Sequence, residues 1–512
     1  MKKISTFFAA LVICLSVFAK PVDVNDALVV ARNFWSQHSD RPFPEMVDVA
    51  ELYGLTEMYL FASVADDGFV IVAKDDIAKP ILGYSTDNGI QARTLPENLL
   101  GWLNHYSGEI ASARNAGYEG SEFSDAEWNN LRNNTYAAAN GRKAVEPLVK
   151  TFWDQGSPYN NMCPYDVSYG YNVRSVTGCA ATAMAQVLRY WKWPIKGTGT
   201  KTYTCTSLSE NAPERTLTAD FGSTTYQWEF MPEGKADYTW NNDQKNAVAT
   251  LMYHCGVSLE MGYTSNLSTA YTSAYPTALK SYFSYNNAAS VKYKSSYSEA
   301  NWKSMLKAEL DARHPLLYRG SSEDQTGGHA FVCDGYDGDD NFHFNWGWSE
   351  LGDAYFPLSS LTPTQVGTGA GLGDYSYYQG AVFNVTPSIQ TANSFTLPSS
   401  VAYGATLSGS CGFRNTGATV FNGYLGVAAY NSNDEFVNII AQSDLLTFNG
   451  NSSKTVTINY TVASPMSTGD YTAKAVCSID GTTWYVITVG YNGCATEMPF
   501  TVTGQAPDPV GD

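Results

Sequence analysis

The chain has 512 residues and a formal net charge of −18 at pH 7, from 31 Lys and Arg against 49 Asp and Glu. This charge disfavours a nucleic-acid partner or an anionic membrane surface, because both are themselves negative. The length predicts two to four domains. Eight of the nine cysteines lie beyond the first 19 residues, too few and too scattered to predict a disulfide framework.

Residues 1–19 have the pattern of a secretory signal peptide. Lys2 and Lys3 precede a short apolar run over 7–18, and Ala19 ends a small-residue cleavage site. The run is too short to span a bilayer, and no later segment offers a long uncharged apolar stretch. We therefore expect an exported protein without a transmembrane segment, either secreted or held at the cell surface or in the periplasm.

Residues 20–143 predict a small α+β domain that precedes the rest of the protein. Its last part, 119–146, is rich in Asn, Ser, Gly and Ala and reads as an exposed linker, in which Arg142-Lys143 offers a cleavage site. An ordinary interdomain linker, which is not a cleavage site, explains that composition equally well. Helices are expected over 24–38 and from Pro96 to Tyr106, and strands over 57–63, 68–73 and 80–84.

Residues 144–387 predict a domain with a helical front half and a β back half. The helix expected over 177–191 carries Cys179 in its first turn, with Thr177 as its N-cap. Orphan N–H groups and the helix dipole favour negative charge there, so we expect a lowered pKa and an available thiolate. The alternative is a structural cysteine that acts as a small buried hydrophobe. Further helices are expected over 240–256 and 299–312, and strands over 315–318, 329–336, 341–346 and 354–356.

Residues 388–512 predict an all-β, immunoglobulin-like sandwich, because short alternating runs recur between Gly, Asn and Asp. No acid/base cluster is recognisable in this region. We expect it to act as a spacer or a surface-binding module, and the sequence does not indicate its partner. The expected strands lie near 403–413, 420–430, 436–447, 453–461, 470–478 and 482–490.

A thiolate nucleophile needs a base, and among six histidines His329 has the most suggestive setting. Two glycines precede it at the start of a strand and leave open space on one side. An amide at Asn345 could fix the tautomer of the imidazole, and the indole of Trp346 could shield it from water. Gln155, upstream of Cys179, could donate an amide N–H to a developing oxyanion. A plain structural histidine stays possible on these residues alone.

Four motifs, at 153–160, 177–186, 327–332 and 345–348, occur in the chain order of papain-like peptidases and closely resemble the streptopain family. Residues 68–73 and 80–85 are similar to the inhibitory prodomain of that family. The resemblance implies a secreted cysteine endopeptidase that is made as a zymogen, acts on protein or peptide substrates and is inhibited by its own prodomain.

By position, the resemblance assigns Cys179 as the nucleophile, His329 as the general base and acid, and Gln155 as the oxyanion donor. Trp346 matches the indole beside the histidine, and Asn345 is the candidate to orient the imidazole. Gly328 and Thr269 match substrate-binding positions. Thr269 replaces a serine of streptopain, which leaves the specificity of that subsite open.

Two other functions share these folds. One is a secreted adhesin or peptidase inhibitor without catalysis, and the other is thiol-dependent acyl transfer to an amine, as in transglutaminases. No cofactor is implied. No metal site is expected, because no Cys or His pair has ligand spacing, and residues 337–340 read as a solvated turn rather than a calcium loop.

Overall fold

The computed structural model describes residues 20–504 except 40, 66, 87–88, 91–96, 118–121, 135–143, 168–172, 326 and 362–373. The predicted signal peptide and the Arg142-Lys143 cleavage site lie outside the described residues. The chain forms two compact units. The first contains residues 1–143, 337–341 and 354–357, and the second contains 144–336, 342–353 and 358–512.

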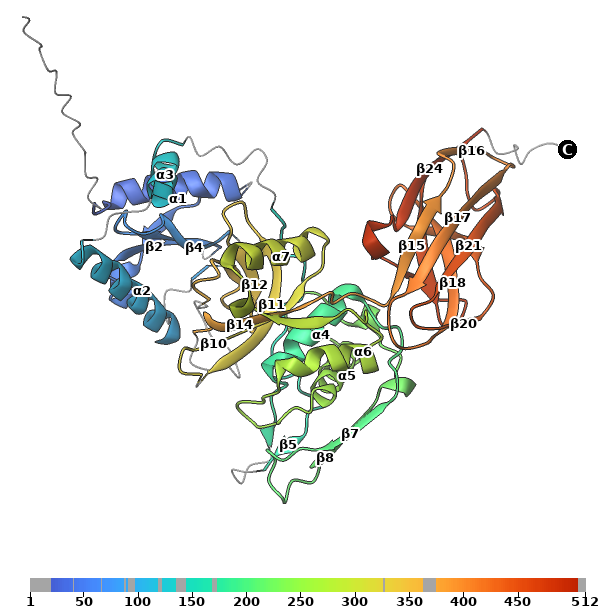
Figure 1. The fold of residues 1–512 in the computed structure, drawn as a ribbon, viewed down its shortest axis with the longest axis horizontal. Helices are drawn as coiled ribbons and strands as arrows, with labels where there is room; N and C mark the ends of the chain where they lie inside the picture. The colour runs from blue at the N-terminus through green and yellow to red at the C-terminus, as the bar shows by residue number, and fades with distance from the viewer. Residues whose placement is uncertain are drawn as a thin grey trace, which may run out of the picture. The chain divides into compact units, whose positions relative to one another are not determined.

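The first unit is built around an antiparallel sheet with strand order β1-β2-β3-β4-β13. Strands β2 and β3 are buried along their whole length, which explains their continuous apolar sequence. Helix α1 packs against β2, β3 and α3 (Figure 1). The elements are α1 (Val24–His38), β1 (Met46–Asp48), η1 (Ala50–Tyr53), β2 (Met58–Ser63), β3 (Phe69–Ala73), β4 (Ile81–Ser85), α2 (Glu97–Asn115), α3 (Glu122–Arg132) and β13 (Ala354–Phe356).

The expected helix over 24–38 and the three expected strands are confirmed, but the linker assigned to 119–146 is wrong over 122–132. Helix α3 occupies that stretch and buries Trp128 and Leu131. These two side chains lie one turn apart on the same helix face and anchor an otherwise polar segment. The polar composition therefore concealed a short amphipathic helix.

The turn over 337–341 is also different from the solvated turn that we expected. The Asp337 carboxylate is buried and accepts hydrogen bonds from the Tyr84 hydroxyl at 2.9 Å and the Asn341 amide at 2.8 Å. His38 Nε2 lies 3.2 Å from a carboxylate oxygen of Asp339. The ligand atoms of His38, Asp337 and Asp339 lie within 4.8 Å of one another. The Asp337 oxygens already accept hydrogen bonds from neighbouring protein donors. The close approach of these three side chains is therefore explained by hydrogen bonds within the protein.

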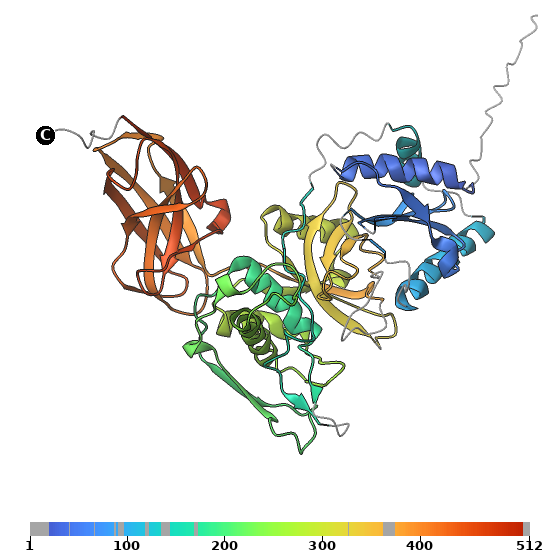
Figure 2. The same ribbon diagram turned by 180° about the vertical axis from the view of Figure 1, so that it is seen from behind.

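The second unit begins with the predicted helical half and continues into a sheet with strand order β12-β11-β10-β14-β9. Helix α4 contacts both α5 and strand β11 (Figures 1 and 2). The predicted order of helices and strands is confirmed. The elements are β5 (Tyr165–Asp166), β6 (Val173–Arg174), α4 (Cys179–Trp191), β7 (Thr200–Thr204), β8 (Thr216–Asp220), η2 (Phe221–Ser223), η3 (Trp228–Phe230), α5 (Asn242–Ser258), η4 (Thr272–Ala274), α6 (Tyr275–Tyr282), β9 (Ser290–Tyr293), η5 (Lys294–Ser296), α7 (Glu299–Asp311), β10 (Leu316–Ser321), β11 (Gly328–Tyr336), β12 (Phe342–Asn345) and β14 (Tyr377–Phe383).

The remainder of this unit is all-β, as predicted, and consists of two sheets with one shared hydrophobic core. One sheet has the order β15-β17-β21, and the other has β16-β24-β22-β18-β19, with β20 and β23 paired at its side. The elements are β15 (Ile389–Thr396), β16 (Ser400–Ala402), β17 (Thr406–Asn415), β18 (Phe421–Asn431), β19 (Phe436–Gln442), β20 (Leu446–Phe448), β21 (Ser453–Thr461), β22 (Gly469–Ser478), β23 (Tyr485–Val486), η6 (Tyr491–Gly493) and β24 (Glu497–Thr503).

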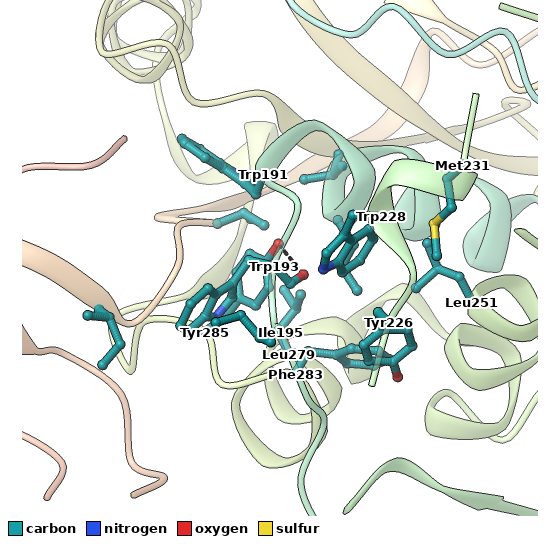
Figure 3. Packing of buried hydrophobic residues seen from close by; sticks show 14 of the residues in the cluster. Trp191, Trp193, Ile195, Tyr226, Trp228, Met231, Leu251, Leu279, Phe283 and Tyr285 are labelled. Carbon is teal, nitrogen blue, oxygen red and sulfur yellow. Dashed lines mark hydrogen bonds between the residues drawn. The ribbon is translucent and has the colours of Figure 1, made fainter. Parts of the chain in front are cut away.

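The C-terminal end of α4 is embedded in aromatic side chains. Lys192 ends the helix in the left-handed conformation, and Pro194 follows two residues later. The indole of Trp228 donates to the Pro194 carbonyl at 3.0 Å, and the indole of Trp193 donates to the Ser284 carbonyl at 2.8 Å. Figure 3 shows these rings packed with Trp191 and their apolar neighbours. This packing fixes the helix whose other end carries Cys179.

The eight cysteines that the structure describes are all unpaired. Within the described parts of the chain, no helix combines the length and the apolar character that crossing a membrane requires.

Candidate active site

Cys179 is the first residue of α4, and the turn before it requires a glycine. Gly178 has φ +86°, and a Cβ at that position would lie 2.7 Å from Met261 and 2.9 Å from the Ser268 carbonyl oxygen. The predicted N-cap at Thr177 is therefore wrong. The N-cap position belongs to Gly178, and the Thr177 hydroxyl instead shares a 2.8 Å hydrogen bond with the Thr182 hydroxyl.

Cys179 is partly exposed, and the pKa of its thiol is not lowered as we expected. Burial raises the pKa of Cys179 above its ordinary value and outweighs the opposing hydrogen bonds from the amides of Ala330, Ala180 and Cys179 itself. The helix terminus therefore does not create a thiolate in this arrangement. Ionisation needs a cationic partner or a more open site.

Gln155 lies beside the helix start with an unused side chain. The backbone carbonyl of Gln155 accepts a hydrogen bond from Thr177 N at 3.0 Å, and this bond places Gln155 next to the turn that precedes Cys179. The side chain is fully buried, and neither Oε1 nor Nε2 has a hydrogen-bond partner among the residues that the structure describes. Buried amides are normally paired, so a free one at this position points to a function.

His329 lies near the beginning of β11, and one nitrogen of its ring is hydrogen-bonded to a backbone carbonyl. Nε2 lies 2.8 Å from the Trp346 carbonyl oxygen, and Nδ1 is buried without a partner among the described residues. Burial lowers the pKa of His329 to about 4. Over the described residues, no hydrogen bond or ion pair joins this imidazole to Cys179. Strand β11 contacts helix α4, and the amide of Ala330, the residue after His329, acts on the Cys179 thiol and lowers its pKa.

The ring of His329 packs among aromatic side chains. Its centroid lies 4.5 Å from that of Trp348 and 6.2 Å from that of Trp346, with both rings stacked, and 5.1 Å from Tyr375. The predicted Trp346 therefore does lie near the histidine, but Trp348 is nearer. Trp348 stood within the 345–348 motif, and only the fold could rank the two indoles.

Asn345 makes contacts other than the predicted one to the imidazole. Its Nδ2 donates to the Thr151 carbonyl at 2.8 Å, and its Oδ1 accepts from Gln186 Nε2 at 2.9 Å and from Gly347 N at 3.1 Å. In this structure the imidazole bonds to the Trp346 carbonyl instead. The orienting role of Asn345 is therefore absent from this arrangement.

Sequence reasoning did not identify Gln186, which joins three parts of the site. It lies two turns along α4 from Cys179 and is fully buried. Its Oε1 accepts from the Thr151 hydroxyl at 3.0 Å and from Trp153 N at 3.2 Å, and its Nε2 donates to Asn345. The amide thus connects α4 to β12 and to the segment that leads to Gln155. A polar residue among the small apolar residues of α4 was the signal available in the sequence.

The two predicted substrate contacts lie at the edges of this site. Gly328 is exposed and pairs with Ser321 at the start of β11. Thr269 exchanges backbone hydrogen bonds of 2.8 and 3.0 Å with Gly262. The Ser268 hydroxyl, one residue earlier, donates to the Val176 carbonyl at 2.7 Å and ties this loop to the segment before Cys179.

Two protein-family models match parts of the chain. Residues 153–356 match the model of the Peptidase C10 family, and residues 19–110 match that of the Spi protease inhibitor. The chain is 34% identical to streptopain of Streptococcus pyogenes over 355 residues, which cover 66% of this chain and 82% of streptopain. The chain belongs to the Peptidase C10 family. The resemblance predicted from the four motifs is confirmed.

Other members of the family match over different lengths. The thiol protease/hemagglutinin PrtT of Porphyromonas gingivalis is 31% identical over 403 residues, which cover 77% of this chain and only 45% of PrtT. Active interpain A of Prevotella intermedia is 35% identical, with a TM-score of 0.42 over 47% of this chain and 95% of that one. A fragment of prointerpain A from the same organism is 29% identical, with a TM-score of 0.49 over 67% and 99% of the two chains.

Proposed function

We propose that the chain is an exported cysteine endopeptidase made as a zymogen, with peptide-bond hydrolysis carried out by Cys179 and His329. The observation that carries this proposal is the buried, unpartnered amide of Gln155 beside the partly exposed thiol at the start of α4. An adhesin or an inhibitor that lacks catalysis has no need to leave a buried amide unpaired. Membership of the Peptidase C10 family supports the same reaction class.

In the proposed reaction, the Cys179 thiolate attacks the carbonyl carbon of the substrate and the carbonyl oxygen becomes negative. The Cys179 N–H is at the first position of α4, where helix geometry gives it no intrahelical acceptor, and it can donate to that oxygen. Gln155 Nε2 supplies the second donor. His329 first takes the thiol proton and then gives it to the leaving amine, and water hydrolyses the thioester.

The hydrogen bond of His329 fixes which ring nitrogen acts as the base. A carbonyl oxygen can only accept, so Nε2 carries the proton that faces Trp346, and Nδ1 is left unprotonated and able to take the proton of the half-buried Cys179 thiol. Residues 20–143 supply the inhibitor in this proposal, in keeping with the match of residues 19–110 to a protease inhibitor.

The test is hydrolysis of fluorogenic peptides by the protein after removal of residues 20–143. Cys179→Ala and His329→Ala should each abolish turnover without altering the circular dichroism spectrum, because the thiolate and the imidazole act as one unit. Near-normal turnover by a folded Cys179→Ala protein would refute the proposal. Transfer of the acyl group to an added amine in preference to water would instead identify a thiol acyltransferase.

A further inference from the structure

A groove of about 690 Å³ lies over the β10, β14 and β9 edge of the sheet in the second unit. Its described lining residues include two cations, Arg319 and Lys294, and no Asp or Glu. This composition contrasts with the chain as a whole, which has a net charge of −18. The remaining described lining is uncharged and includes four tyrosines, Tyr293, Tyr297, Tyr377 and Tyr378.

The strand register connects this groove to the candidate active site. Ala330, Arg319, Gly380 and Tyr293 lie opposite one another on β11, β10, β14 and β9, so their side-chain positions share one face of the sheet. Arg319 is therefore one strand, about 5 Å, from Ala330, whose amide is close enough to the Cys179 thiol to lower its pKa. The Tyr293 ring lies over Gly380 in this row, since a Cβ at Gly380 would lie 3.0 Å from that ring.

Contacts with the segment after Thr269 agree with this placement. The Arg319 guanidinium lies 3.4 Å from the Thr272 hydroxyl, three residues beyond the predicted substrate contact Thr269. The Tyr275 hydroxyl donates to the Ala180 carbonyl at 2.9 Å, next to Cys179. Burial raises the pKa of Tyr275, and the charges of both Cys179 and Arg319 also act on it. Arg319 thus lies between the strand that carries His329 and the loop that follows Thr269.

Arg319 itself is half-buried and has no carboxylate partner among the described residues. A guanidinium in this setting has lost part of its hydration without gaining an opposite charge, and its planar donors match a carboxylate. The second cation, Lys294, donates to the Leu358 carbonyl at 3.3 Å, and burial lowers its pKa. Four tyrosines around these groups offer ring faces and hydroxyls to an extended peptide.

We infer that this groove is a specificity subsite in which Arg319 binds a carboxylate of the peptide substrate. The inference rests on the proposed peptidase function and names the substrate class for it: peptides with an acidic group a short distance from the scissile bond. The carboxylate can come from an Asp or Glu side chain or from the C-terminus of the peptide, and both present the same group to the guanidinium.

The experiment uses the full chain after its natural maturation and internally quenched peptides that are amidated at the C-terminus. In each pair, one peptide has Glu and the other Gln at a single position within four residues of the scissile bond. A third set keeps Gln and ends in a free carboxylate. We expect kcat/KM to favour the carboxylate-bearing peptide by about tenfold or more at one position, because hydrogen bonds to charged groups are the stronger ones. The preference should shrink as salt is added.

Arg319→Gln should remove this preference, and circular dichroism should show that the variant is folded. Arg319→Lys should keep part of the preference. The matched control is Arg215→Gln, because Arg215 is also half-buried but does not line the groove and has Glu210 as its ion-pair partner. If the wild type cleaves Glu and Gln peptides with equal kcat/KM at every position, the inference is wrong and the proposed function still stands. This outcome does not depend on whether the variant folds. Failure of the wild type to cleave any peptide would instead overturn the proposed function.

Discussion

At the scale of single residues, the site is marked by polar atoms that lack partners. The two side-chain atoms of Gln155 and the Nδ1 atom of His329 are buried and unsatisfied. Leaving a buried polar group unpaired costs about 1–3 kcal/mol, so a structural role does not explain them. In the proposed reaction, Gln155 Nε2 donates to the negative oxygen of the transition state and His329 Nδ1 takes the thiol proton, so two of these three atoms gain a partner.

Gln155→Ala should lower kcat far more than it raises KM. The Gln155 amide is proposed to meet a charge that exists only in the transition state, and loss of one such donor costs about 100- to 1,000-fold in kcat. Steady-state kinetics with a neutral fluorogenic peptide measures both constants. Gln227→Ala is the matched control, because Gln227 is exposed and bonds only locally. A change confined to KM would make Gln155 a substrate-binding residue.

The sequence was sufficient to predict which residues matter here, but not how they are paired in this state. Cys179, Gln155 and His329 stand in recognisable motifs, because their chemistry demands particular side chains at particular places in the chain. The bond from His329 to the Trp346 carbonyl and the raised pKa of Cys179 depend on burial and packing between distant segments. Local sequence carries little information on either.

At the scale of secondary-structure elements, Gln186 binds helix α4 to the strands around it. Strands such as β2, β3 and β11 were predictable because their apolar runs are long. Elements that were not predicted from the sequence include α3 and β16, in which one or two buried side chains decide the structure, and the longer strands β14 and β15. The role of Gln186 was hidden for a different reason, since its partners Thr151 and Asn345 lie 35 and 159 residues away in the chain.

Gln186→Ala should destabilise the second unit and lower kcat. It leaves the Thr151 hydroxyl and Trp153 N without their acceptor and Asn345 without one donor, at a cost of about 1–3 kcal/mol for each buried group. Thermal denaturation and kcat measure the two effects. Gln186→Glu separates positioning from mere packing: a protonated carboxylic acid can still donate to Asn345, whereas a carboxylate cannot. Activity relative to wild type should therefore be higher at pH 5 than at pH 7.5. A pH-independent loss in the Glu variant would reduce Gln186 to a packing residue.

At the scale of the whole molecule, the first unit includes two segments from the second half of the chain. Asp337–Asn341 and Ala354–Pro357 belong to it, and they flank the strand and the motif that carry Asn345, Trp346 and Trp348. Within the unit, the Tyr84 ring stacks on Tyr355 at 5.0 Å, and the Tyr84 hydroxyl donates to Asp337. Cutting the chain near Lys143 leaves these contacts in place, so cleavage alone does not release residues 20–143.

We therefore expect residues 20–143 to remain an inhibitor after cleavage, with a strength that depends on pH. Burial alone would lower the pKa of His38, but its hydrogen bond to Asp339 and the charge of Asp337 raise it above the ordinary value. A group whose pKa is raised in the bound state stabilises that state below the free pKa, about 6.5, and loses this contribution as pH rises through the raised value. Inhibition should accordingly weaken from pH 6 to pH 8.

The measurement is the inhibition constant of purified 20–143 added to the mature peptidase at several pH values, after circular dichroism shows that the fragment is folded. Cleavage converts an intramolecular inhibitor at an effective concentration of about millimolar into one at its bulk concentration, so inhibition should also fall on dilution. His38→Gln should flatten the pH dependence, while His105→Gln, elsewhere in the same fragment, serves as the control. No inhibition by the folded fragment at tens of micromolar would reduce residues 20–143 to a spacer or a folding aid. Equal inhibition at pH 6 and pH 8 would leave latency standing but remove His38 from it.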